Sequence, residues 1–217
     1  PENGESLLEI SGFWANDLCV HSIDISVVIL AGGRSRRMGF DKALLEVGGR
    51  PLIGILSERM RRLTDRVLIS SNDPGKYGFL DIPVIPDRFA GHGPLAGLHA
   101  AMIHQVSDLY VLLACDLPNL PLPLVRKMIA LADGYDAAIP RTADGRAHPL
   151  CAVYRRTCLP HIEESLRKGE RKFIGTFLKR DVSVKWVSPQ EGQYGETDLA
   201  NINTPGDLRL LEIGARD

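Results

Sequence analysis

The first 33 residues of this 217-residue chain contain no lysine or arginine, so the positively charged start of a secretory signal peptide is missing there. Apolar runs are short, and none approaches the ~20 residues of a membrane-spanning helix. The four cysteines show no C-x-x-C spacing, which favours reduced thiols. The formal net charge is −1, whereas a nucleic-acid-binding domain is normally basic. These absences predict a cytoplasmic protein without a membrane or nucleic-acid partner.

Familiar catalytic motifs are missing as well. No G-x-x-x-x-G-K-[ST] segment occurs, which excludes a P-loop, and the glycine-rich turn at residues 32–37 is not a G-x-G-x-x-G dinucleotide motif. Neither H-E-x-x-H nor G-x-S-x-G is found, so the usual zinc-protease and serine-hydrolase sites are excluded. Any catalytic site must therefore use other residues.

From Ile23 onward, aliphatic segments of strand length alternate with segments of helical periodicity. Strands are predicted at 25–30, 67–70, 84–85, 109–114, 136–140, 149–154 and 182–187. Helices are predicted at 51–63, 94–106, 122–132, 160–168, 172–179 and 204–213.

This alternation predicts an α/β fold with a mostly parallel, doubly wound sheet. The Asp144-Gly145 pair favours a hairpin that adds antiparallel strands in the C-terminal half. Residues 1–22 lack the alternation and are interpreted as an N-terminal extension, whereas residues 23–217 are expected to form one domain.

The stretch 27–42 joins an unbroken apolar strand to a turn rich in glycine and arginine. Gly32 and Gly33 allow a sharp turn and leave backbone N–H groups open, as phosphate oxygens require. Residues 34–50 carry five cations against two anions, so the turn is a candidate anion site. A solvated basic loop is the alternative.

Polar residues also follow other predicted strands, at Ser70–Asn72, Asp87 and Asp116. Ligands in open α/β sheets bind beyond the carboxyl ends of the strands, so these residues are expected at one rim. Asp116 directly follows a buried aliphatic strand, and a single carboxylate of this kind suits Mg²⁺, which also takes phosphate oxygens and water. Capping of the following helix is the alternative for Asp116.

Five motifs occur in the order and spacing of one enzyme family. They are Leu30–Lys42, Gly93–Gly97, Cys115–Pro118, His148-Pro149 and Asn201–Pro205. Together they resemble the molybdenum cofactor guanylyltransferases, or molybdopterin-guanine dinucleotide synthases, over about Ser26 to Leu211. The resemblance implies a single Rossmann-like nucleotidyltransferase domain that uses GTP, molybdopterin and Mg²⁺. Contact with molybdoenzyme chaperones is a further expectation from the family.

The resemblance assigns a role to each matching position. Catalysis falls to Lys42, Asp116 and Arg37, while Asp116 and Asn203 would hold the metal. The implied nucleotide-binding residues are Leu30, Ala31, Gly32, Gly33, Lys42, Ser70, Asn72, Asp87 and Asp116. The implied molybdopterin-side residues are Arg37, Gly93, Gly97, His148, Asn201 and Asn203. Ser70 departs from family members that carry Asn, and Asn72 is expected to replace part of that contact.

The implied reaction transfers GMP from GTP to the phosphate of molybdopterin and releases pyrophosphate. An ionised phosphate is already a nucleophile, so positioning and charge neutralisation suffice. A cytidylyl-transferring relative and a sugar-1-phosphate nucleotidyltransferase are alternatives; Gly32, where the cytidylyl branch tends to carry Ala, favours guanine. A non-catalytic molybdopterin carrier is disfavoured because it would not need Lys42, Asp116 and Asn203 together.

The remaining polar clusters are interpreted more simply. The histidines at 92, 99 and 104 are spaced by seven and five residues, which does not form one metal-binding face. His92 is expected in a loop, and His99 and His104 on a helix surface. The basic residues Arg167, Lys168, Arg171 and Lys172 either form a solvated helix end or attract an anionic substrate.

Overall fold

The computed structural model describes residues 23–31, 41–170, 173 and 181–202. Four predicted features therefore lie wholly or largely outside the described residues. These are the extension at 1–22, the glycine-rich turn from Gly32 onward, the helix at 172–179 and the helix at 204–213.

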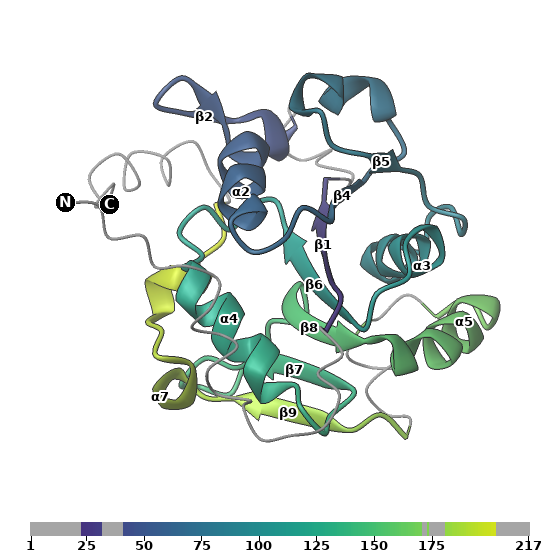
Figure 1. Cartoon of the computed structure of the whole chain (residues 1–217), viewed down its shortest axis with the longest axis vertical. Helices are drawn as coiled ribbons and strands as arrows, with labels where there is room; N and C mark the ends of the chain where they lie inside the picture. The colour runs from purple at the N-terminus through teal and green to yellow at the C-terminus, as the bar shows by residue number, and fades with distance from the viewer. Residues whose placement is uncertain (1–22, 32–40, 171–172, 174–180, 203–217) are drawn as a thin grey trace.

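The centre of the molecule is a seven-stranded sheet in the order β5-β4-β1-β6-β8-β7-β9 (Figure 1). Its strands are β1 Ile25–Leu30, β4 Val67–Ser70, β5 Val84–Ile85, β6 Leu109–Ala114, β7 Ala137–Pro140, β8 Cys151–Arg155 and β9 Val184–Val187. Strand β8 pairs antiparallel with both β6 and β7, whereas the other pairings are parallel. The predicted fold class is confirmed, with the refinement that one strand of the hairpin, β8, is the antiparallel one.

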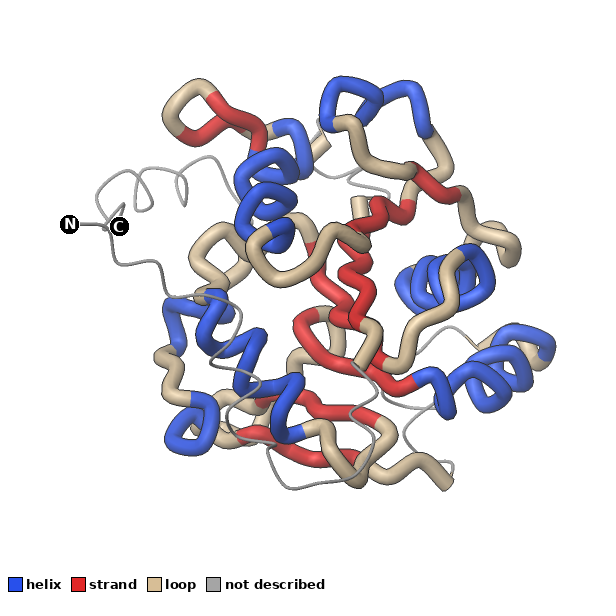
Figure 2. The backbone as a smooth tube through the Cα atoms, in the orientation of Figure 1, coloured by secondary structure: helices blue, strands red, loops and turns tan. Residues whose placement is uncertain are grey.

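Helices cover both faces of this sheet (Figure 2). The longer ones are α2 Leu52–Arg61, α3 Pro94–His104, α4 Leu122–Leu131 and α5 Leu159–Arg167. Shorter elements are η1 Lys42–Leu44, η2 Pro74–Leu80, η3 Arg156–Cys158, α7 Pro189–Gly192, η5 Glu196–Leu199 and the small hairpin β2 Glu46–Val47 with β3 Arg50–Pro51.

Alternate residues of each central strand pack against opposite layers. Val27 and Ile29 of β1 join the core that α2 and α4 cover, whereas Val28 and Leu30 join the core beneath α3 and α5. Both faces of β1 are therefore apolar, which explains its unbroken aliphatic sequence. The strands are held rigidly from both sides, and so are the residues at their ends.

Three sequence predictions need correction. Helix α3 ends at His104, so Val106, which the prediction included in this helix, lies beyond its end and is 66% exposed. Pro51 is the N-cap of α2 rather than its first helical residue. His99 is buried instead of lying on the helix surface, because α5 packs against α3 and places Glu163 near its ring. The His99 error arises because a neighbouring element rather than local periodicity decides its burial, whereas the other two errors concern where a helix begins and ends.

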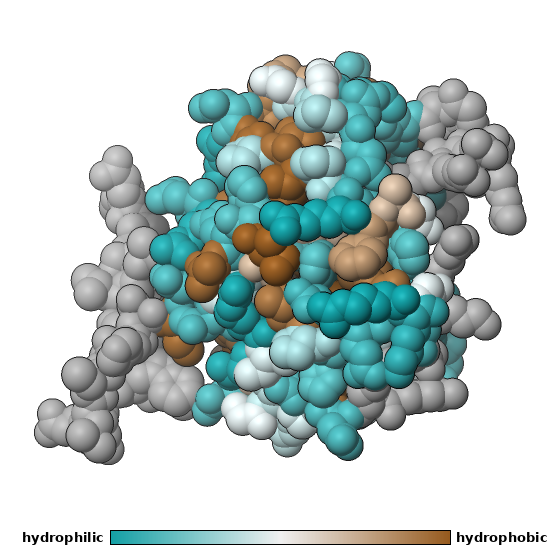
Figure 3. All heavy atoms as spheres, turned by 90° about the vertical axis from the view of Figure 1, so that its right-hand side faces the viewer, coloured by the Kyte–Doolittle hydropathy of each residue, from teal (hydrophilic) through white to brown (hydrophobic). Residues whose placement is uncertain are grey.

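Apolar side chains are interspersed with hydrophilic ones on the face that carries α3 and α5 (Figure 3). Such scattered exposure is ordinary for a folded protein. Within the described residues, no helix has the length and apolar character needed to cross a membrane.

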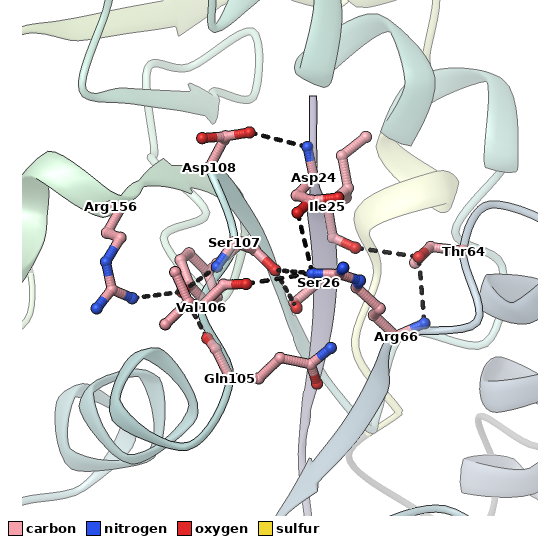
Figure 4. Close-up of polar contacts among 11 residues, drawn as sticks. Asp24, Ile25, Ser26, Thr64, Arg66, Gln105, Val106, Ser107, Asp108 and Arg156 are labelled. Atoms are coloured by element: carbon pink, nitrogen blue, oxygen red, sulfur yellow. Dashed lines mark hydrogen bonds and ion pairs between the residues drawn. The ribbon is translucent and has the colours of Figure 1, made fainter. Parts of the chain in front are cut away.

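A polar network closes the end of the sheet where the parallel strands begin (Figure 4). We call it the N-terminal pole and define it by Asp24, Ser26, Thr64, Arg66, Ser107 and Asp108. The buried hydroxyls of Ser26 and Ser107 are 2.7 Å apart, and Arg66 donates to the Val106 carbonyl at 3.2 Å. The backbone N–H of Asp24 donates to Asp108 Oδ2 at 2.9 Å. The polar atoms of this pole thus bond to one another.

Candidate active site

The opposite end of the sheet gathers the polar residues predicted from the strand ends. Leu30 is paired with both Ser70 and Ala114, and Ser70 is paired with Ile85. The residues that follow these positions therefore meet at one edge, as expected for parallel strands. We call this edge the C-terminal rim and define it by Ala31, Lys42, Ser70, Asn72, Asp87 and Asp116.

The centre of the rim is the pair formed by Lys42 and Asp116. Lys42 Nζ lies 3.4 Å from Asp116 Oδ2, and the two side chains are 21% and 15% exposed. Asp116 Oδ1 is buried and has no hydrogen-bond partner within the described part of the chain. A buried carboxylate oxygen without a partner is costly by about 1–3 kcal/mol, so this atom is suited to a ligand.

The C-terminal segment reaches this centre through its backbone. Ile202 N–H donates to the Asp116 carbonyl at 3.0 Å, which places the exposed Asn201 beside the rim. Asn203 lies outside the described residues, as do Gly32, Gly33 and Arg37. The structure thus brings one side of the predicted metal site together and does not describe the other.

The donor set at Asp116 agrees with a magnesium site. Within the described residues no group of three or more His, Cys, Asp and Glu side chains is arranged to hold a metal. Mg²⁺ needs no such cage, because it usually takes one or two carboxylates and completes its shell with phosphate and water oxygens. Asp116, with its unpartnered Oδ1, fits that pattern.

A second part of the rim fixes the orientation of Asp87. Ser70 Oγ donates to Asp87 Oδ1 at 3.3 Å, and Asn72 Nδ2 donates to Oδ2 at 3.1 Å. The Asp87 N–H donates back to Asn72 Oδ1 at 2.9 Å. Ser70 and Asn72, which the sequence pointed to as nucleotide contacts, are thus engaged in holding the Asp87 carboxylate.

The first turn of α3 lies directly against this group. A Cβ atom at Gly97 would be 2.5 Å from Ser70 Oγ and 2.7 Å from Leu30 Cδ2, so no other residue fits there without movement. Gly93, the N-cap of α3, has a φ of +68°, which glycine adopts without strain. Gly97 thus lets the first turn of α3 lie against the strand ends, and Gly93 supplies the backbone conformation that precedes the helix.

Two functional candidates, Asp41 and Tyr77, were missed by sequence reasoning. Asp41 Oδ1 accepts a hydrogen bond from the Ala43 N–H at 3.1 Å, so Asp41 caps the turn that carries Lys42. The fully buried Tyr77 hydroxyl lies 2.9 Å from Asp41 Oδ2 and 3.0 Å from the Ala31 carbonyl. An Asp before a short helical turn was a detectable signal. Tyr77 follows a turn motif and had none.

His148 stands beside the end of β6. The carbonyl of Leu150, two residues later, accepts the Ala114 N–H at 2.7 Å. His148 Nε2 is buried without a partner among the described residues. Burial and the Arg146 cation lower the pKa of His148 from its usual value of 6.5, so its ring is neutral at neutral pH.

Cys115 is unsuited to nucleophilic chemistry although it adjoins Asp116. Burial, followed by the nearby Asp116 and Asp41 carboxylates, raises its pKa to about 12, so the thiolate is not formed near neutral pH.

In the basic cluster, Arg167 and Lys168 pair with Glu163 and Glu164 at 2.7 and 2.6 Å. That half of the cluster thus behaves as an ordinary helix surface, and Arg171 and Lys172 lie outside the described residues.

The fold and the rim together define the class of protein. A cytidylyltransferase that acts on 2-C-methyl-D-erythritol 4-phosphate, from Thermus thermophilus, superposes with a TM-score of 0.66. Its identity is 21% over 90% of this chain and all of its own, which shows the shared fold alone. The fold is that of Rossmann-like nucleotidyltransferases.

Closer relatives identify the family. The description "MobA-like NTP transferase domain" matches residues 27–182. The probable molybdenum cofactor guanylyltransferase of Pelotomaculum thermopropionicum is 40% identical over 88% of this chain and 93% of its own length. The molybdenum cofactor guanylyltransferase of Syntrophotalea carbinolica is 36% identical over 84% and 88%. The solved structure of Archaeoglobus fulgidus molybdopterin-guanine dinucleotide biosynthesis protein A gives a TM-score of 0.73 at 26% identity, over 87% and 97%.

The chain belongs to the MobA-like NTP transferase family. It is an enzyme of the nucleotidyltransferase class, and the predicted resemblance is confirmed.

Proposed function

We propose that this enzyme transfers GMP from GTP to the phosphate of molybdopterin and releases pyrophosphate. The observation that carries the proposal is the Lys42–Asp116 pair beside the end of β1, with a buried carboxylate oxygen left for a ligand. The names of the relatives at 36% and 40% identity support the choice of substrates.

In the proposed reaction an oxygen of the molybdopterin phosphate attacks the α-phosphorus of GTP. A new P–O bond forms, and the bond from the α-phosphorus to the bridging oxygen of the β-phosphate breaks. The electron pair leaves with pyrophosphate. No general base is needed because the attacking phosphate is already ionised, and the neighbouring Cys115 stays protonated and so offers no thiolate nucleophile.

The residues of the rim would mainly position and neutralise charge. Lys42 would neutralise phosphate oxygens, and the backbone at Ala31 would begin the phosphate-binding turn. Asp116, with Asn203, would hold Mg²⁺, which supplies Lewis-acid activation and a template for the phosphates. Arg37, also outside the described residues, would face the attacking phosphate.

The Asp87 carboxylate is the proposed contact for the guanosine half. Each of its oxygens already accepts one hydrogen bond, from Ser70 or Asn72, and each retains a free lone pair. Guanine offers two adjacent donors, N1–H and its amino group, whereas cytosine offers only its amino group. A carboxylate held in one orientation therefore favours guanine. Gly93, Gly97, His148 and Asn201 would lie on the molybdopterin side.

A competition between nucleotides tests this function. Purified enzyme is incubated with Mg²⁺, molybdopterin, a sugar 1-phosphate and equal concentrations of GTP and CTP, and the nucleotidylated products are separated by mass. We expect the guanine dinucleotide to predominate. A predominant cytosine dinucleotide would overturn the assignment of guanine as the base. Transfer to sugar 1-phosphates instead of molybdopterin would overturn the assignment of molybdopterin as the acceptor.

Molybdopterin binding without any product would favour a carrier. Contact with molybdoenzyme chaperones remains a prediction from the family.

A further inference from the structure

Tyr77 lies between Ala31 and Asp41, the two described residues that flank the segment 32–40. Ala31 is the last residue before that segment, and Asp41 is the first after it. The Tyr77 hydroxyl lies 3.0 Å from the Ala31 carbonyl oxygen and 2.9 Å from Asp41 Oδ2. The single phenol O–H thus lies within hydrogen-bonding distance of two acceptors, one on each residue that flanks positions 32–40, and links Ala31 to Asp41.

The Tyr77 side chain is itself fixed firmly. It belongs to η2, is completely buried, and packs in the same core as Val27, Ile29 and Ala43. Burial and the Asp41 carboxylate raise the pKa of Tyr77 above its usual value of 10, so the hydroxyl keeps its proton throughout the physiological range. It is thus a permanent donor on a rigid support, and a bond to a carboxylate is stronger than one between neutral groups.

The contact between Tyr77 and Asp41 also restricts the position of Lys42, the next residue in the chain. Its Oδ1 accepts the Ala43 N–H and so sets the start of η1, while its Oδ2 faces Tyr77 and, at 3.4 Å, Lys76. Lys42 is the first residue of η1, and its ammonium group lies 3.4 Å from Asp116. The contacts therefore run from Tyr77 through Asp41 and Lys42 to Asp116.

We propose that Tyr77 is a positioning residue for nucleotidyl transfer. Its hydroxyl clamps Ala31 to Asp41, and through Asp41 it sets Lys42 opposite Asp116. The catalytic part of this assignment rests on the proposed function, whereas the clamp itself is a property of the fold. Misplacement by about 1 Å in a preorganised site reduces rates on the order of 10²-fold, so one hydroxyl remote from the substrates is expected to matter.

The test compares Tyr77→Phe with Tyr110→Phe. Both residues are fully buried, and both hydroxyls contact a backbone carbonyl, at Ala31 and Gln105 respectively. Tyr110 lies toward the N-terminal pole, where its hydroxyl accepts the Ser107 N–H. The two variants thus remove the same atom from two different ends of the sheet, and their difference separates positioning from general loss of stability.

Hydrogen exchange of the Ala43 amide provides a readout that needs no substrate. We expect its protection to fall at least several-fold in Tyr77→Phe and to stay unchanged in Tyr110→Phe, measured at a temperature where both variants remain folded. For GMP transfer we expect kcat to fall roughly 10- to 100-fold in Tyr77→Phe. In Tyr110→Phe it should stay within two-fold of the parent enzyme.

Asp41→Ala probes the same contact from a partly exposed side chain, in case Tyr77→Phe folds poorly. It should lose at least as much activity as Tyr77→Phe, because it removes the cap on Ala43 as well as the Tyr77 contact. The double variant should lose little more than Asp41→Ala alone, because the Tyr77–Asp41 contact is already absent there. Asp41→Asn, which keeps the capping oxygen, should restore most of the Ala43 protection.

Unchanged Ala43 exchange and kcat in Tyr77→Phe, or equal losses in Tyr110→Phe, would overturn the proposal. If the parent enzyme transfers no GMP, the proposed function fails, and the exchange experiment still decides whether the clamp exists.

Discussion

The two ends of the central sheet differ in whether their buried polar groups have hydrogen-bond partners. At the N-terminal pole, Ser26, Ser107 and Arg66 bond to one another or to nearby carbonyls (Figure 4). Of the buried side-chain atoms that lack a partner in the described residues, none belongs to this pole. Three belong to residues at rim-side strand ends, namely Asp116, Arg141 and His148, and two belong to α3 and α5.

This difference separates stability from function within one sheet. An unpartnered buried polar group destabilises a fold by about 1–3 kcal/mol, so it is retained where a ligand completes it. The polar residues of the pole connect strand ends to each other. The residues of the rim are held by others, as Asp87 is by Ser70 and Asn72, yet each Asp87 oxygen keeps a lone pair for a ligand. Substitutions in the pole should therefore lower the free energy of unfolding without lowering activity. Substitutions in the rim should lower activity without lowering the free energy of unfolding.

The largest effects are expected from Lys42→Ala and Asp116→Ala. Each removes one preorganised charged group from the rim, and such losses reduce rates on the order of 10²–10³-fold. Pyrophosphate release under saturating substrates measures the rate, and circular dichroism measures folding. Lys185→Ala, a change on β9 that breaks a 2.8 Å pair with Glu191 of α7, is the matched control and should keep full activity. Near-normal turnover by either rim variant would remove the functional distinction between rim and pole.

A smaller effect is expected from Asn72→Ala. The substitution removes the amide that donates to Asp87 Oδ2 and accepts from the Asp87 N–H, so the carboxylate loses its fixed orientation. We expect KM for GTP to rise about 10-fold, equivalent to ~1.4 kcal/mol, with kcat changed less. Asn119→Ala, at an exposed position after Asp116, serves as the control. An unchanged KM would show that the orientation of Asp87 does not matter for GTP.

At the pole, Ser107→Ala should lower the free energy of unfolding by about 1–3 kcal/mol and leave kcat unchanged. The change leaves the buried Ser26 hydroxyl without its 2.7 Å partner. Urea denaturation measures the loss. The double variant Ser26→Ala/Ser107→Ala should lose less than the sum of the single variants, because both partners of one bond are then absent. A fall in kcat at a temperature where the variant is folded would break the comparison.

The smallest expected effect is the contribution of His99 to the pH dependence of the free energy of unfolding. Burial lowers its pKa from the usual 6.5, opposed by Glu163 and reinforced by Arg88 and Arg167. The unfolded chain then binds more protons than the folded chain as pH falls below about 6.5, so the free energy of unfolding decreases on acidification. His99→Gln should flatten this decrease below about pH 6.5, and His104→Gln, at an exposed position on the same helix, serves as the control. Parallel curves for the parent and His99→Gln would show that His99 contributes nothing to acid sensitivity.

Much of the fold was predictable because both faces of the sheet are covered. The aliphatic strands at 25–30 and 109–114 were unmistakable, and parallel pairing then placed Asp87 and Asp116 at one rim. Local patterns did not predict contacts made across the sequence. Tyr77 meets Asp41 from 36 positions away, and Glu163 of α5 meets His99 of α3.

The contacts of Ser70 illustrate the same limit of prediction from local sequence patterns. Its position after a strand was readable from the sequence, but its contact with Asp87, which follows a different strand, depends on the fold. The predictions for Arg37 and Asn203 stay untested, because both residues lie outside the described part of the chain.

The most direct test of the central claim is Mg²⁺-dependent pyrophosphate release with GTP and molybdopterin, measured in parallel for the parent enzyme, Asp116→Asn and Ser107→Ala. We predict that the parent and Ser107→Ala require Mg²⁺ and reach the same maximal rate. Asp116→Asn, which keeps the shape of the side chain but loses its charge, should stay at least 10²-fold slower at every Mg²⁺ concentration. Full activity of Asp116→Asn, or release that is independent of both Mg²⁺ and molybdopterin, would contradict the account.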